Sequence, residues 1–131
     1  MREKRPQAKT EEKPRPSSLM DRLFALSDEV RYVAIYRGGR LAQRERPGLA
    51  HASAAESDRY EELIVNPTLL KLVVQRGEID CGGVKFVVIR YGNFFQTVFP
   101  VPDGHVSVAL EPTANPPDFV FRIREMLDTE G

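Results

Sequence analysis

Short apolar segments separated by turn residues dominate the second half of the chain. In residues 105–110 Val106, Val108 and Leu110 alternate with His105, Ser107 and Ala109, and residues 93–101 form a further apolar-rich segment, so both are expected to be β-strands. Residues 84–91 are apolar on both faces, so we expect a packed layer on each side of this strand. Glycine, proline and aspartate occupy the gaps between the segments, and these residues favour tight turns. The pattern predicts a three-stranded antiparallel meander.

An earlier pair of segments predicts a β-hairpin. Residues 31–36 form an apolar strand, and residues 40–46 form a more polar return strand. Gly38-Gly39 lies between them, and two consecutive glycines suit the positive φ angles of a two-residue hairpin turn.

Two helices are expected at the ends of the folded region. Ser18 is a good N-cap for the first helix, which should end near residue 28. The second should begin at residues 115–117, an asparagine followed by two prolines. The apolar residues at helical spacing are Leu19, Leu23 and Leu26 in the first helix and Phe119, Ile123 and Leu127 in the second.

A third helix is expected in the middle of the chain, over residues 67–76. Asn66 suits the N-cap and Pro67 the first helical position, so this pair should separate the helix from residues 58–65. For residues 58–65 a helix and an irregular segment both remain open. Gly77 should end the helix. The expected buried face consists of Leu69, Leu70, Val73 and Val74.

Together these segments give the order helix, two strands, helix, three strands, helix. A five-stranded antiparallel sheet between helices would bury every apolar face, so the expected fold class is α+β. We expect a single domain over residues 17–131. Residues 1–16 are rich in charged residues and proline and hold almost no apolar side chains, so we expect a disordered tail there.

The composition excludes several classes of protein. At 131 residues, with 41% hydrophobic and 29% charged residues, the chain is large enough to fold as one domain. A net charge of zero argues against a nucleic-acid binder, whose domain is usually basic. No apolar run approaches the roughly 20 residues of a membrane-spanning helix. With one cysteine, no internal disulfide and no apolar signal core, we expect a cytoplasmic protein.

Few residues are candidates for chemistry. The two histidines, His51 and His105, have no cysteine or carboxylate at metal-ligand spacing, so we expect no metal and no cofactor. A nucleophilic Cys81 would need a nearby base, which the sequence does not show. We interpret Cys81 as a bystander and His105 as a surface or hydrogen-bonding residue, and we do not expect an enzyme.

Carboxylates gather at four positions just before the central helix: Glu56, Asp58, Glu61 and Glu62. They would suit a general acid–base pair or a cation site. Clustered charges near a helix start more often form a solvated face, and we favour that interpretation.

The predicted hairpin is rich in arginine. Residues 31–46 contain five arginines and a single acid, Glu45. The planar guanidinium group binds carboxylates and phosphates, so this hairpin is a candidate docking patch for an acidic partner. Solvated charges that protect an edge strand from aggregation explain the same residues. The partner-binding candidates are Arg37, Arg40, Arg44 and Arg46.

The order of elements resembles that of the roadblock / dynein light chain family. The resemblance covers residues 18–128 and rests on segments 32–40, 84–90 and 104–110. It implies an α-β-β-α-β-β-β-α domain with strands in the order 2-1-5-4-3, and a non-enzymatic adaptor. Because prokaryotic members partner small Ras-like GTPases, it also implies a regulator or partner of such a GTPase. A profilin-like or PAS-like sensory module that binds a small ligand is the alternative.

In that strand order residues 84–91 lie at an edge of the sheet. A long apolar edge is hazardous because its unpaired N–H and C=O groups invite aggregation, and pairing with a second copy across a two-fold axis removes the hazard. Family dimers likewise form one continuous sheet across two subunits, so we expect a homodimer. The expected interface residues are Leu70, Val74, Phe86 and Val88. A central strand in a monomer would explain the same apolar pattern.

Overall fold

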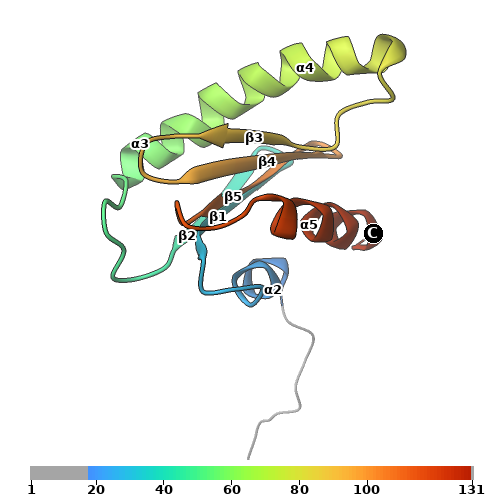
Figure 1. The fold of residues 1–131 in the computed structure, drawn as a ribbon. Coiled ribbons are helices and arrows are strands. Elements are labelled where there is room, and N and C mark those ends of the chain that lie inside the picture. Colours follow the sequence, from blue (N-terminus) through green and yellow to red (C-terminus); the bar gives the residue numbers. More distant parts are fainter. Residues whose placement is uncertain (1–17, 131) are drawn as a thin grey trace, which may run out of the picture.

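The computed structural model describes residues 18–130 and has the expected α+β fold (Figure 1). In chain order its elements are α2 (Leu19–Phe24), β1 (Val30–Arg37), β2 (Arg40–Glu45), α3 (Ala55–Tyr60), the π-helical turn η2 (Glu61–Val65), α4 (Asn66–Asp80), β3 (Val87–Arg90), β4 (Phe95–Val101), β5 (Gly104–Leu110) and α5 (Pro117–Thr129). The tail expected over residues 1–16 lies outside the described residues.

The five strands form one antiparallel sheet in the order β2-β1-β5-β4-β3, which confirms the expected order. Strands β1 and β5 are central, β2 lies at one edge, and β3 lies at the other. The first hairpin also has the expected turn, with φ angles of 59° at Gly38 and 77° at Gly39. These left-handed angles suit glycine and match the twist of the flanking strands.

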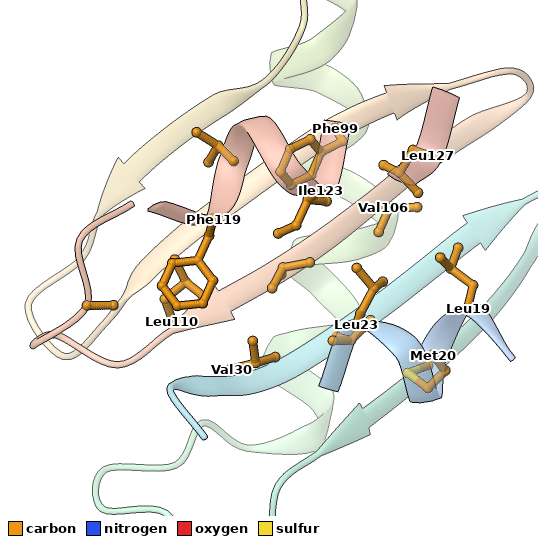
Figure 2. Packing of buried hydrophobic residues seen from close by; sticks show 14 residues of the cluster. Leu19, Met20, Leu23, Val30, Phe99, Val106, Leu110, Phe119, Ile123 and Leu127 are labelled. Atoms are coloured by element: carbon orange, nitrogen blue, oxygen red, sulfur yellow. The ribbon is translucent and has the colours of Figure 1, made fainter. Parts of the chain in front are cut away.

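One face of the sheet carries the apolar core. Helices α2 and α5 lie side by side on this face (Figure 1). Leu23 of α2 and Ile123 of α5 are fully buried against Val106 and Phe99 of the sheet (Figure 2). In α2 Leu19 and Leu23 are buried as expected, but the helix ends at Phe24 instead of near residue 28, so Leu26 lies in the turn that follows. The apolar face of α5 is confirmed, as is the N-cap of α2, because the Ser18 hydroxyl accepts a hydrogen bond from the Asp21 amide.

The other face is covered by one continuous helical run made of α3, η2 and α4 (Figure 1). The break expected at Asn66 is therefore wrong: Asn66 has helical φ and ψ angles of −65° and −44°. In an α-helix, the ring of Pro67 would clash with the carbonyl group four residues earlier. The wider π-turn relieves this crowding, and the Asn66 amide donates five residues back, to the Glu61 carbonyl.

Gly77 lies inside α4 instead of ending it, so the expected helix end is also wrong. A Cβ atom at this position would lie 3.1 Å from Val84 Cγ2 and 3.2 Å from the Gly83 carbonyl carbon. The returning chain thus passes so close to the helix that a side chain at this position would push its neighbours away by a few tenths of an ångström, and the Gly83 amide donates to the Gly77 carbonyl at 3.0 Å. Pairing with β4 begins only at Val87, so β3 is shorter than the expected strand over residues 84–91.

A buried carboxylate joins the helical run to the sheet. Glu62 is fully buried, and its Oε1 atom accepts hydrogen bonds from Ser107 Oγ at 2.6 Å and Asn66 Nδ2 at 3.0 Å. The same oxygen lies 2.8 Å from His105 Nε2, and Oε2 accepts from the Tyr32 hydroxyl at 3.1 Å. We call these five residues the Glu62 network. It links the helix to both central strands.

The Glu62 network corrects two expectations. Glu62 does not belong to a solvated face; of the two alternatives for His105, the hydrogen-bonding residue is confirmed and the surface position is wrong. The physical reason is that the sheet face below the helix offers polar donors, and these compensate the cost of burying a carboxylate. Burial and the nearby Glu62 charge raise the pKa of Tyr32, which keeps its hydroxyl protonated as a donor.

We predict that Glu62→Ala lowers the free energy of unfolding by about 3 to 5 kcal/mol, because the remaining network members lose their common acceptor in a buried place. Urea denaturation followed by circular dichroism measures this change. Glu56→Ala on the same helical run is the control, since Glu56 is exposed and should change stability by less than about 0.5 kcal/mol. Equal losses in the two variants would contradict the prediction.

Candidate protein-interaction surfaces

Two large apolar side chains of α4 are exposed among polar ones. Leu72 and Ile79 are seven residues apart, so they share one side of the helix, and their exposed fractions are 63% and 75%. Of the expected buried face, only Leu70 is buried, while Leu69, Val73 and Val74 are not fully covered. The sheet below α4 carries small and polar side chains, so it offers little apolar surface for the helix to cover.

Strand β3 borders the same region. It is the last strand of the sheet, and its outer side has no strand partner within residues 18–130. Val88 is 39% exposed, whereas Phe86 is half-buried and packs against the rings of Phe99 and Phe121. We call the outer side of β3 together with Leu72 and Ile79 the helix–edge surface.

The arginines of the first hairpin fall into two groups. Arg46 is half-buried and donates to three backbone carbonyls, those of Phe24, Ser27 and Val30. It therefore holds the connection between α2 and β1. Arg37, Arg40 and Arg44 are exposed on or beside the edge strand β2.

Two of the exposed arginines already have acidic neighbours. Arg44 lies 3.0 Å from Asp21, and Arg37 lies 3.2 Å from Glu130. These pairs are solvent-exposed, so each contributes little stability and can exchange its partner. Arg40 makes no side-chain hydrogen bond or ion pair with any residue in the described part of the chain. The hairpin therefore presents an exposed arginine cluster at the sheet edge opposite β3.

The carboxylates at the start of the helical run are not equivalent. Glu56 is exposed, whereas Asp58 and Glu61 are half-buried beside the sheet. Burial raises the pKa of Asp58, and the negative charge of Glu45 raises it further. Burial also raises the pKa of Glu61, although a hydrogen bond from the Tyr91 hydroxyl at 2.9 Å partly opposes this.

Asp58, Glu61 and Glu62, but not Glu56, line a small pocket between the helical run and the sheet. Its lining includes Tyr32, Glu45, Ser53, Asp58, Glu61 and Gln96. Sequence reasoning missed Tyr32 and Gln96, because they stand on strands far away along the chain. The only local signal was the spacing of four residues between Asp58, Glu62 and Asn66, which places them on one side of a helix.

The other candidates for chemistry are separate from this pocket. His51 and Cys81 are exposed, and within residues 18–130 no hydrogen bond joins Cys81 to either histidine. The described part of the chain holds no group of three or more histidine, cysteine, aspartate or glutamate residues able to bind a metal ion. None of its helices combines the length and apolar character that crossing a membrane requires.

The strand order, the central helix on one face and the terminal helices on the other define a roadblock-like fold. The solved structure of the gliding protein MglB from Thermus thermophilus is similar, with a TM-score of 0.58 and 14% identity over 83% of this chain and 79% of that one. MglC from Myxococcus xanthus gives a TM-score of 0.44 and 12% identity over 82% and 94%. No protein-family model and no curated protein matches the sequence.

We predict that Asp58→Asn stabilises the protein at pH 7. The pKa of Asp58 is higher in the folded state than its ordinary value of 3.8. At pH values between 3.8 and the folded-state pKa, the folded state therefore binds more protons than the unfolded state. The free energy of unfolding therefore falls as pH rises through this range. An asparagine does not titrate, so the variant avoids this loss of stability. Its midpoint of urea unfolding should exceed that of the parent at pH 7, and the difference should shrink as pH approaches 3.8.

Asp21→Asn provides a contrast of opposite sign. Hydrogen bonds from Arg44 and Ser18 lower the pKa of Asp21, so its contribution to stability is present above the unfolded pKa and disappears as pH falls. This variant should be slightly less stable than the parent at pH 7. A shift of both midpoints in the same direction would contradict the electrostatic explanation.

Proposed function

We propose that this chain forms a homodimer through the helix–edge surface and works by binding other proteins. The observation that carries the proposal is the outer side of β3, which has no strand partner in the described residues, together with the exposed apolar residues Leu72 and Ile79 of α4. Unpaired strand edges recruit other strands, and exposed apolar patches mark contact sites. Pairing two copies of β3 across a two-fold axis gives the strand edge hydrogen-bond partners and covers the exposed apolar residues in the same interface.

In the proposed dimer the expected interface residues take different roles. Val88 lies on the pairing strand and contacts the second copy directly. Val74 and Phe86 flank the junction, one on the helix and the other at the entry to β3. Leu70 is buried, so it supports the helix from below. Leu72 and Ile79 extend the contact along α4.

The dimer would act in the cytoplasm as a non-enzymatic adaptor or regulator of a small Ras-like GTPase. Support comes from the roadblock-like fold, from the family that the sequence resembles, and from the similarity to a gliding protein. The exposed Arg37, Arg40 and Arg44 suit an acidic surface on that partner, and Arg46 holds the backbone beneath them. The mechanism is docking on a rigid dimer, without covalent chemistry.

A sensory module with a small ligand remains the second candidate, and the pocket under the helical run is the observation that favours it. The cavity volume of this pocket is only about 20 Å³, measured as the space open to the centre of a water-sized sphere. Ligand pockets for whole metabolites are far larger. The pocket therefore suits a single small chemical group, which gives the adaptor more support than the sensor.

The first test concerns the dimer. We expect Val88→Lys to convert a dimer near twice 14.8 kDa into a monomer, because it places a charge in the apolar junction. Light scattering on a sizing column measures the mass. Ala42→Lys is the matched control, since Ala42 is exposed on the opposite edge strand and should leave the dimer intact. A monomeric parent protein would overturn the proposal, and a monomeric Ala42→Lys would move the junction to β2.

The second test concerns the partner. We expect Arg40→Glu with Arg44→Glu to weaken binding to a small Ras-like GTPase by about tenfold or more, because like charges across an interface repel. Calorimetric titration of purified GTPases in their GDP and GTP states measures the affinity. Arg59→Glu is the control, since Arg59 is an exposed arginine outside the hairpin. A dimer that binds none of the GTPases would leave self-association standing and overturn the GTPase assignment.

A further inference from the structure

The pocket under the helical run is lined by the side-chain amide of Gln96, whose polar atoms are not enclosed on all sides; in the described residues the fully enclosed side-chain polar atom without a partner is Asn66 Oδ1. Gln96 of β4 is only 2% exposed and lies on the face of the sheet that α3 and η2 cover. Within residues 18–130 its side chain makes no hydrogen bond, whereas the nearby buried Glu62 and Ser107 are bonded. Buried amides normally have partners. Because Gln96 lines the pocket, a group entering the pocket is the available partner.

The same pocket keeps an excess of negative charge. Glu45, Asp58 and Glu61 all line it. Arg31 also lines it, but the Arg31 guanidinium is already bound by the Glu111 carboxylate at 3.0 Å and by backbone carbonyls. Burial is the largest cause of the raised pKa of both Asp58 and Glu61, and the charge of Arg31 opposes it only weakly at Asp58. A cationic group in the pocket would relieve this cost.

The size of the pocket restricts what that cation can be. Free space for a water-sized sphere extends over about 20 Å³, which suits a compact ammonium group better than a planar guanidinium. The described residues offer no set of three ligands for a metal ion. An ammonium group has three donors, which matches the carboxylates of Asp58 and Glu61 and the amide oxygen of Gln96.

A second, wider hollow lies beside the pocket. It shares Tyr32, Glu45, Ser53 and Asp58 with the pocket and adds Gln43 and Ala55, with about 210 Å³ of free space on the same measure. An alkyl chain that carries an ammonium group could lie in this hollow while its charged end enters the pocket.

We infer that the pocket binds the ammonium group of a lysine side chain from a protein partner. The wider hollow holds the aliphatic stem, and Gln96 gains the hydrogen bond that it lacks. This inference does not rest on the proposed dimer or on the GTPase, because the pocket is built within one chain and is separate from the helix–edge surface.

The test follows the Gln96 side-chain amide of the full-length protein by ¹H–¹⁵N NMR. Two probes are titrated, n-butylammonium chloride and Nα-acetyl-lysine methylamide, each against sodium chloride of equal ionic strength. We expect a saturable shift of the Gln96 amide signal with both probes and none with sodium chloride. No shift with either probe, or an equal shift with sodium chloride, would overturn the inference.

Two further outcomes concern the identity of the ligand. Tighter binding of guanidinium chloride than of n-butylammonium would overturn the choice of lysine over arginine. Binding of n-butylammonium without binding of the lysine derivative would overturn the protein source and point to a free amine.

Matched variants locate the site. Asp58→Asn and Glu61→Gln should each weaken binding of n-butylammonium about tenfold, because each removes a charged acceptor. Glu125→Gln, an exposed carboxylate on α5, should leave the affinity unchanged. Because Asp58→Asn is expected to stabilise the fold, weaker binding by this variant does not reflect unfolding. Unchanged binding in both pocket variants would overturn the site.

Discussion

The buried Glu62 carboxylate is the interaction on which this arrangement depends. One side chain collects donors from β1, from β5 and from the following turn of its own helix, so it fixes where the helical run sits on the sheet. A buried charge is tolerated only when every approach to it is occupied by a suitable polar group. The polar character of the sheet face at Tyr32, His105 and Ser107 follows from this requirement.

The two faces of the sheet consequently differ in what they can offer a partner. On one face, apolar side chains of α2 and α5 pack against the sheet and cover most of its apolar surface (Figure 2). On the other face the helix is attached largely by polar contacts, so its remaining apolar residues, such as Leu72 and Ile79, point to solvent. Because few apolar side chains fill the space between the helix and the sheet, the pocket at Gln96 lies below the helix. The pocket and the exposed apolar residues of α4 thus lie on the face of the sheet that does not carry the main apolar core.

Much of the fold could be predicted from the sequence because alternation and turn residues act locally. The strand faces around Phe99, the glycine turn at residues 38–39 and the cap at Ser18 depend on neighbours along the chain. The errors at Asn66 and Gly77 have another origin: each residue has a local preference that a distant segment overrides. The pocket could not be predicted, since Gln96 and Asp58 meet only through the sheet order.

The π-turn also has a consequence for the spacing of residues along the helical run. In a regular α-helix, each residue lies about 40° around the helix axis from the residue four positions earlier. Asp58, Glu62, Asn66 and Leu70 would therefore turn progressively away from the sheet. The extra residue in the turn Glu61–Val65 cancels part of this drift and keeps all four over the sheet. Deleting one residue from the turn would rotate the preceding segment by about 100°. The length of this segment is therefore under tighter constraint than the identity of most of its side chains.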